Sequence, residues 1–452
     1  MTEPSRRRFL RRSVTVSAVL AAGCLDDAPA TDTPSSGTPA DSGGTQVPTT
    51  TSGPGTPDDP ATPTETATST PSPTPPGAVS WWADLESPVE IPPVVSEGSV
   101  YAGVEDGTIT AHATADGTVR WRFDAERPVR ELALADGSLL AVTGTTELGA
   151  DHTLLALDAA TGDRRWTFSP TDWWLELLAT RDGRVYVGTA DDALGPTGQT
   201  LYAVPVADGE PDWSAEIGDP REAVLTEDAV FVSTTGRVFA FERADGSERW
   251  RVETPDPTFT TLAAIDGTVL QGFEPEDADV FGILAGFDAT TGEERWRVDD
   301  RTVTSVGTRG GDLYVGGETV AAVDPADGRT LWASDGAGFV TDAGVGHARV
   351  YAGSDDIRAY DRESGEMAWA WTPDPTQGGV QPTGLVGGLL HLDAYHDAEP
   401  RNQYKFTVDT DTGESVWTFE DGTALTDLAV GDAAAAVGGE NGRLYAFDVP
   451  GE

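Results

Sequence analysis

The chain has 452 residues, 76 of them acidic and 29 basic, and a formal net charge of −47. A protein that binds a polyanion needs a basic face, so this charge excludes nucleic acid as a general partner. Because Cys24 is the single cysteine, an internal disulfide, a multi-cysteine zinc site and an iron–sulfur cluster are excluded as well.

Residues 1–24 predict an export signal that is not part of the fold. Arg6 and Arg7 stand in Ser-Arg-Arg-Arg-Phe-Leu, and an apolar run from Val14 to Ala22 follows. That run is shorter than the about 20 apolar residues of a membrane-spanning helix. The arrangement resembles the twin-arginine signal, which exports folded proteins. The Ala-Ala-Gly-Cys stretch resembles a lipoprotein processing site, which implies that Cys24 takes a lipid and becomes the mature N-terminus.

Residues 25–78 predict a disordered stalk. This segment of 54 residues contains 14 threonines and 12 prolines, and Val47 is its only large aliphatic residue after Leu25. Such a composition cannot bury a core. The prolines favour extended polyproline II, at about 3.1 Å per residue.

Residues 79–452 contain one recurring phrase, which residues 154–166 show as Leu-Leu-Ala-Leu-Asp-Ala-Ala-Thr-Gly-Asp-Arg-Arg-Trp. A tryptophan ends each copy, glycine stands four residues before it, and a small residue stands ten residues before it. An alternating strand, a turn in which glycine accepts a positive φ, and a returning strand together predict a β-hairpin. Another strand precedes each phrase, as in Val100–Gly103, and repeat lengths run from 36 to 48. These features predict four-stranded propeller blades.

The sequence therefore predicts an all-β fold, a single β-propeller in 79–452. The repeat contains nine units, and eight blades would require one irregular unit, such as that from Trp369 to Val416. Arg443–Asp448 begins a phrase that lacks its tryptophan, so we expect the two terminal strands to share one blade and close the ring. The expected blade-packing residues are Trp82, Trp121, Trp166, Trp213, Trp250, Trp296, Trp332, Trp369 and Trp417.

The phrase Leu-x-Ala-x-Asp-x-x-Thr-Gly-x-x-x-Trp resembles the repeats of the pyrroloquinoline quinone (PQQ)-type β-propeller superfamily. That superfamily includes quinoprotein alcohol dehydrogenases and BamB-like outer-membrane assembly lipoproteins, and the resemblance covers 79–452. The dehydrogenases carry adjacent cysteines over the quinone. This chain has no cysteine in 79–452, so no residue is carried over at that position.

Two groups of residues are candidate sites. Trp173 and Trp174 lie outside the repeat positions and form either an apolar strand or an aromatic platform for a glycan. His391, Asp393, His396 and Asp397 bring together ligand types that suit a divalent metal, or else form a polar loop. A strand would place His391 and Asp393 on one face, with His396 in the following loop.

No catalytic nucleophile is evident in 79–452. We therefore expect a lipid-anchored propeller at the outer face of the cell membrane that binds or scaffolds a protein or glycan partner. One alternative is an exported dehydrogenase with PQQ and Ca²⁺ at the ring centre, and another is a glycan-binding propeller. The many carboxylates and the single lysine, Lys405, resemble the proteins of extreme halophiles, whose surfaces stay hydrated in concentrated salt.

The export signal gives a first testable prediction. Replacing Arg6 and Arg7 by lysine keeps the charge but removes the planar guanidinium pair, so unprocessed precursor should accumulate inside the cell. Cys24→Ala should instead release exported protein into the medium, measured by immunoblotting of cell and medium fractions. Retention of the Cys24→Ala protein at the membrane would refute the lipid anchor.

Overall fold

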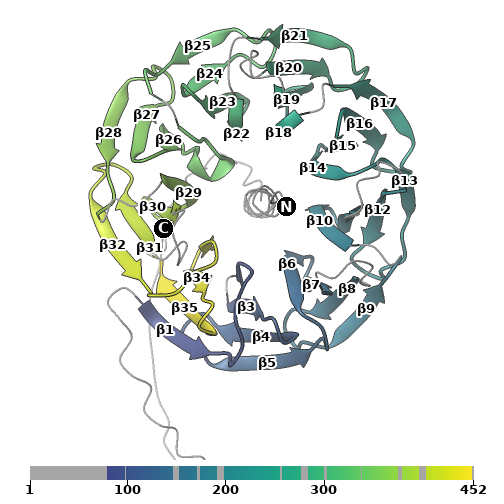
Figure 1. The fold of residues 1–452 in the computed structure, drawn as a ribbon, viewed down its shortest axis with the longest axis vertical. Coiled ribbons are helices and arrows are strands. Elements are labelled where there is room, and N and C mark those ends of the chain that lie inside the picture. The colour runs from purple at the N-terminus through teal and green to yellow at the C-terminus, as the bar shows by residue number, and fades with distance from the viewer. Residues whose placement is uncertain are drawn as a thin grey trace, which may run out of the picture. The chain divides into compact units, whose positions relative to one another are not determined.

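The computed structural model describes residues 79–96, 98–145, 152–170, 174–190, 198–254, 257–275, 283–299, 303–336, 338–374, 379–395 and 404–449. Within these ranges the chain forms nine antiparallel sheets arranged as a ring around one axis (Figure 1). The one helical element described is the 3-10 turn η1 (Asp342–Gly344). None of the described residues form a helix long and apolar enough to cross a membrane.

The sheets are numbered here as blades 1 to 9 in ring order. Blade 1 contains β1 (Val79–Asp84), β33 (Ala429–Val430), β34 (Ala434–Gly438) and β35 (Arg443–Asp448). Blades 2 to 4 contain β2 (Val94–Val95), β3 (Ser99–Gly103), β4 (Thr108–Ala113) and β5 (Val119–Asp124); β6 (Val129–Ala135), β7 (Ser138–Thr143), β8 (Thr153–Asp158) and β9 (Arg164–Phe168); and β10 (Trp174–Arg181), β11 (Arg184–Ala190), β12 (Thr200–Pro205) and β13 (Trp213–Glu216).

Blades 5 to 7 contain β14 (Pro220–Leu225), β15 (Ala229–Thr234), β16 (Arg237–Glu242) and β17 (Glu248–Glu253); β18 (Pro257–Ile265), β19 (Thr268–Pro275), β20 (Ile283–Asp288) and β21 (Glu294–Val298); and β22 (Val303–Arg309), β23 (Asp312–Gly317), β24 (Ala321–Val323) and β25 (Thr330–Ala333). Blades 8 and 9 contain β26 (Arg349–Gly353), β27 (Ile357–Asp361) and β28 (Met367–Trp371); and β29 (Gly379–Val386), β30 (Leu389–Tyr395), β31 (Tyr404–Asp409) and β32 (Ser415–Glu420).

The all-β propeller and its nine blades are confirmed, and the eight-blade alternative is wrong. The unit that might have been irregular, from Trp369 to Val416, includes most of blade 9, which has all four strands. Blade 8 is the irregular one, with three strands. On its axis side the place of a first strand is taken by η1 and by isolated bridges that join Phe339 to Gly353 and Val345 to Val350.

The two ends of the described chain close the ring, as expected. β1 pairs antiparallel with β35, which in turn pairs with β34 (Figure 1). The register places Trp81 opposite Ala446, and Trp82 opposite Tyr445. The first strand of the domain thus completes a blade whose other three strands lie more than 300 residues later in the chain.

Every hairpin phrase folds in the same register. Its small residue lies directly opposite its tryptophan, as Ala156 does opposite Trp166. The turn glycines have φ angles between +72° and +77°, the left-handed region that glycine adopts without strain. The large indole ring can lie over the strand because no bulky side chain stands across from it.

The tryptophans also join each blade to the next. Eight of them lie over the turn glycine of the following blade, where an added Cβ atom would be 2.4 to 2.7 Å from the ring. The indole N–H of each donates a hydrogen bond of 2.6 to 3.2 Å to the carbonyl oxygen three residues before that glycine. These eight are Trp81, Trp121, Trp166, Trp213, Trp250, Trp296, Trp332 and Trp369.

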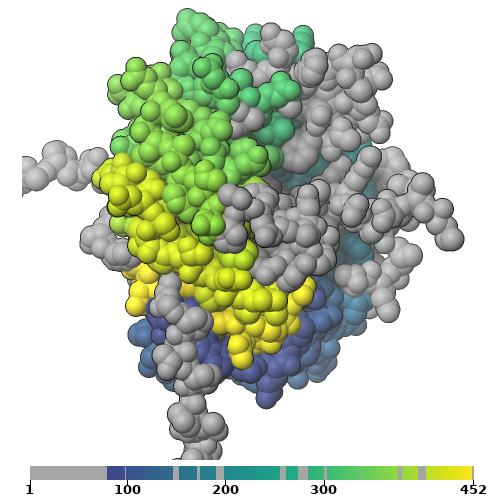
Figure 2. Space-filling view, turned by 60° about the vertical axis from the view of Figure 1, so that its left-hand side comes forward, coloured from purple at the N-terminus to yellow at the C-terminus, as the bar shows by residue number. Residues whose placement is uncertain are grey.

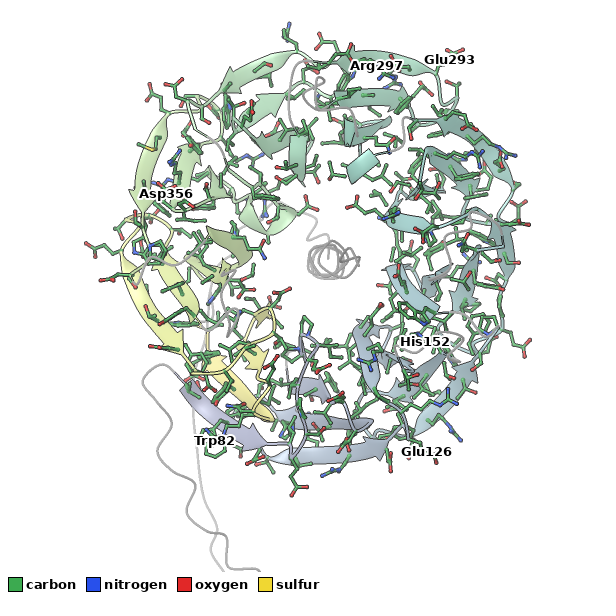
Figure 3. The ribbon with its side chains drawn as sticks, in the orientation of Figure 1. Trp82, Glu126, His152, Glu293, Arg297 and Asp356 are labelled. Atoms are coloured by element: carbon green, nitrogen blue, oxygen red, sulfur yellow. The ribbon has the colours of Figure 1, made fainter. Side chains whose placement is uncertain are left out.

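Two tryptophans depart from the expected pattern. Trp81, and not Trp82, occupies the repeat position in blade 1 and covers Gly117. Trp82 lies on the outer strand with the guanidinium of Arg443 4.7 Å from its ring centroid (Figure 3). Trp417 stacks on Phe447 at 4.8 Å and 9°, and no described glycine lies against its ring.

A pair of glycine substitutions tests this contact. Gly137 and Gly246 have similar φ angles, +70° and +72°. A methyl group at position 137 would have nothing within 4 Å, whereas one at position 246 would lie 2.4 Å from the Trp213 ring. The backbone strain of about 1 kcal/mol is common to both. We expect Gly246→Ala to lower the free energy of unfolding, measured by denaturant titration, by roughly 1 to 3 kcal/mol more than Gly137→Ala. Equal losses would show that the tryptophan contact contributes nothing.

Candidate functional site

The predicted aromatic platform is only partly described. Trp174 lies at the start of β10 and stacks on the buried ring of His152 at 5.8 Å and 7° (Figure 3). His152 Nδ1 accepts the N–H of Leu175, so Nε2 carries the proton and donates to the carbonyl of Thr145. One face of Trp174 is therefore covered by the protein itself. Trp173 lies outside the described residues, as do Arg6, Arg7 and Cys24.

The proposed metal ligands lie in blade 9, where two of them are described. His391 and Asp393 are buried on one face of β30, as the strand pattern predicted. His391 Nδ1 is 2.8 Å from the hydroxyl of Thr407, and burial lowers the pKa of His391 to about 4. His396 and Asp397 lie outside the described residues.

Asp393 is engaged by other groups. Its Oδ1 lies 2.8 Å from the Nζ of Lys405, and both of its oxygens accept the N–H of Leu428 in blade 1. The residues that the structure describes contain no group of three or more His, Cys, Asp or Glu side chains that could hold a metal ion. The described part of this cluster is therefore an ion-paired polar core, and we do not carry the metal hypothesis further.

Blade 9 differs from the other blades at this cluster. Asp393 pairs with Lys405 in a register position where five other blades pair a glycine with an aliphatic residue, as Gly103 with Ile109 and Gly188 with Leu201. Two further blades have Val142 opposite Leu154, and Ser233 opposite Val238. A single blade thus replaces a compact apolar pair by two opposite charges.

The exposed fractions of Lys405 and Asp393 side chains are 0% and 1%. Sequence reasoning chose Asp393 and overlooked Lys405. The signal was present, because Lys405 is the only lysine and stands two residues before the small residue of its phrase, where the other phrases have Leu, Ile or Val.

On alternate blades, a side-chain oxygen accepts a hydrogen bond from a backbone N–H of the next blade. The carboxylate of Glu131 in blade 3 accepts the N–H of Leu177 in blade 4, and Glu222 in blade 5 accepts that of Leu262 in blade 6, at 2.7 and 2.6 Å. In blade 7 the hydroxyl of Ser305 accepts the N–H of Val340 at 2.8 Å. Asp393, on the second strand of blade 9, accepts the N–H of Leu428 next to β33 of blade 1. These contacts join neighbouring blades near the axis.

Glu222 is the most perturbed of these innermost-strand acceptors. Its desolvation raises the pKa to about 7, and the hydrogen bond from Leu262 opposes that rise. A carboxyl with such a pKa can gain or lose a proton near neutral pH. Its neighbour in the structure is a backbone amide, so its evident role is to join blades 5 and 6.

The outer strands divide the ring into two kinds of surface. In blades 2, 3, 5 and 6 an arginine precedes the tryptophan, and the arginines of blades 3, 5 and 6 pair with acids of the same blade, as Arg165 does with Asp158 and Arg295 with Asp288. In blades 7, 8 and 9 the residues before the tryptophan are uncharged. Leu331, Ala368 and Val416 stand directly before it and are exposed, and Met367, two residues before Trp369, is exposed by 58%.

We call the outer strands β25, β28 and β32 the uncharged band. β28 reads Met-Ala-Trp-Ala-Trp and β25 reads Thr-Leu-Trp-Ala, so neither contains a charged residue, and β32 has one charged residue, Glu420, at its end. The tryptophans of these three strands are partly exposed, whereas Trp121, Trp213, Trp250 and Trp296 are buried. Figure 2 shows the side of the ring on which blades 7 to 9 follow one another.

The alternative with PQQ and Ca²⁺ can be compared with these residues. A quinone-bound Ca²⁺ needs a cluster of oxygen ligands, and no acidic cluster of that kind occurs among the described residues. Glu131 and Glu222, acids on the innermost strands of blades 3 and 5 with blade 4 between them, are each bonded to a backbone amide. The described residues do not fit the cofactor, and we derive no chemistry through it.

A substitution at Glu222 gives a prediction with a definite pH dependence. The folded pKa of about 7 lies above the ordinary value of 4.5, so the folded protein binds more protons than the unfolded chain between these values. The contribution of Glu222 to stability is therefore present at low pH and is lost as pH rises through this window. Glu222→Gln keeps an acceptor for Leu262 without the charge.

The variant should match the wild type near pH 4.5 and exceed it in free energy of unfolding by roughly 1 to 3 kcal/mol above pH 7. Glu293→Gln, on the exposed outer edge (Figure 3), is the control. A difference between Glu222→Gln and the wild type that does not change with pH would contradict the raised pKa.

Comparison with known proteins places the chain in a family. The model of the family described as "Outer membrane protein assembly factor BamB" matches residues 61–252, 196–321, 280–399 and 316–451, which together span most of the chain. No curated protein matches the sequence. Among solved structures, a computationally designed protein, Ika8, matches with a TM-score of 0.53 at 16% identity, covering 82% of this chain and 100% of its own.

Two natural proteins have similar folds at lower scores. BamB from Moraxella catarrhalis has a TM-score of 0.49 at 17% identity, over 82% of this chain and 99% of its own. The quinohemoprotein alcohol dehydrogenase from Comamonas testosteroni has a TM-score of 0.48 at 15% identity, over 83% of this chain and 76% of its own. Because the family model matches most of the chain, the chain belongs to the family of the outer membrane protein assembly factor BamB.

Proposed function

We propose that this protein is a lipid-anchored scaffold at the outer face of the cell membrane, where the uncharged band binds a protein partner. The band carries the proposal, because on three consecutive blades an exposed uncharged residue, Leu331, Ala368 or Val416, stands before the tryptophan, where blades 2, 3, 5 and 6 have an arginine. The family name, which refers to an assembly factor, supports a role in binding other proteins. Cys24 would supply the anchor, and the stalk would hold the propeller away from the membrane.

The surrounding charge favours apolar recognition. A protein with net charge −47 repels acidic neighbours, and in molar salt the screening length falls to about 3 Å, so charge pairs across an interface are weakened. Apolar contacts are not screened in this way. A chain that works in concentrated salt is therefore expected to bind partners through an uncharged surface.

The geometry of the band suits an extended partner segment. β25, β28 and β32 are the outermost strands of their sheets. An edge strand offers backbone donors and acceptors to an added strand, while side chains such as Met367 give it apolar contacts. The partner expected here is a protein with an apolar or extended segment.

Site-specific photocrosslinking in cells tests the proposal. A photoreactive residue at Met367, exposed by 58%, should give a crosslinked species of defined mass. The same residue at Val119, exposed by 55% on the outer strand of blade 2, is the matched control and should not. Glutamate at Leu331 should weaken binding by about 1.5 to 3 kcal/mol, roughly ten- to hundredfold, and reduce the yield accordingly.

Equal crosslinking from both positions, or none from either, would contradict a partner on the uncharged band. A quinone spectrum that appears when PQQ and Ca²⁺ are added to the purified protein would instead favour the dehydrogenase alternative. Glycan binding that Trp174→Ala abolishes would favour the third function.

A further inference from the structure

The ion pair in blade 9 brings together an amine and a carboxyl group, which are the two groups that a condensation reaction joins. Lys405 is the single lysine in a chain whose other 28 basic residues are arginine. A guanidinium is not a nucleophile, whereas a lysine amine becomes one when it loses its proton. The Nζ of Lys405 lies 2.8 Å from Oδ1 of Asp393, and it makes no hydrogen bond among the described residues.

Burial disfavours the charged form of this pair. Both side chains have at most 1% of their surface exposed, and taking two ions out of water costs several kcal/mol each unless further hydrogen bonds satisfy them. Among the described residues Lys405 has none of these. Transfer of one proton within the pair, across the 2.8 Å between Nζ and Oδ1, removes both buried charges and gives the amine and the carboxylic acid that a condensation joins.

A third carboxyl lies beside the pair. Asp427 stands next to Leu428, whose N–H donates to Asp393. Burial and then the negative charge of Asp393 raise the pKa of Asp427 to about 7, and the positive charge of Lys405 opposes that rise. Asp427 is therefore close enough to both groups to feel their charges, and it can carry a proton near neutral pH.

We propose that Lys405 and Asp393 condense into an intramolecular isopeptide bond that links β31 to β30. The lone pair of the neutral Nζ attacks Cγ of the protonated Asp393. Asp427 gives a proton to the departing hydroxyl group, which leaves as water, and regains one from the nitrogen. One C–N bond forms, one C–O bond breaks, and no oxidant or other reactant is needed.

The fold supplies the conditions for this step. The two residues are direct cross-strand neighbours, so the reaction is unimolecular, and well-oriented groups react as if at effective concentrations of about 10⁵ M or more. The product is an uncharged amide whose carbonyl oxygen can still accept the N–H of Leu428. The bond removes two buried charges at the junction between blade 9 and blade 1.

Proteolysis of the denatured wild-type protein tests the bond. Trypsin cleaves after Arg362, Arg401 and Arg443, so it separates Asp393 from Lys405 unless they are linked. We expect one species in which peptide 363–401 is joined to 402–443, with a mass lower than their sum by one water. Lysyl endopeptidase, whose only cleavage site is Lys405, should leave the denatured chain intact.

Cleavage after Lys405 and separate peptides of full mass from the folded, purified wild type would overturn the proposal. This result does not depend on any variant folding. Lys405→Arg, which keeps the charge, should abolish the linked species. Asp427→Asn should slow its formation at least tenfold in a time course after synthesis, whereas Glu222→Gln, at another junction between blades, should leave the rate unchanged. Linkage of Asp427→Asn at the wild-type rate would refute the role of Asp427.

Discussion

The contact between a tryptophan of one blade and the turn glycine of the next is the interaction on which the ring depends. It repeats at eight of the nine junctions with the same hydrogen bond. Each blade is a sheet too small to bury its own faces, so its stability comes from its neighbours. The indole supplies a large apolar surface and a directed donor, and glycine is required because any Cβ atom would occupy the position of the ring.

The ninth junction shows what happens where that contact cannot form. Blade 1 is assembled from both ends of the described chain and has no turn glycine for Trp417. Aromatic stacking on Phe447 takes its place, and Phe419 adds contacts to Tyr445 and Phe447. The buried pair of Asp393 and Lys405 lies in blade 9, the blade of Trp417, and contacts the N–H of Leu428 beside blade 1. The junction that joins the ends of the ring thus has the most unusual side-chain chemistry in the described chain, which is where a covalent link would protect closure most.

Function in this fold depends on departures from the repeat. The residues that follow the repeat pack the blades against one another, so their side chains are not available to bind a partner. On the outer strands, the uncharged band departs from the repeat. Inside blade 9, the buried pair of Asp393 and Lys405 departs from it. Near the axis, the side-chain acceptors on alternate blades depart from it as well. A binding surface and a modification site can therefore be proposed at positions where the repeat is broken without loss of the ring.

The local pattern of the sequence was enough to predict the all-β class, the hairpin with its left-handed glycine, the nine units and the closure by the terminal strands, because the repeat is encoded by residues close together in the chain. It misassigned the first tryptophan by one position, since only the pairing of Trp81 with Ala446 reveals the register. It gave metal ligation as one interpretation of His391 and Asp393, and it missed their partners in the fold, Thr407 for His391 and Lys405 and Leu428 for Asp393, because those come from other segments. Which charges are buried together, and which outer strands stay uncharged side by side, was decided by tertiary structure, since these depend on the order of blades around a closed ring.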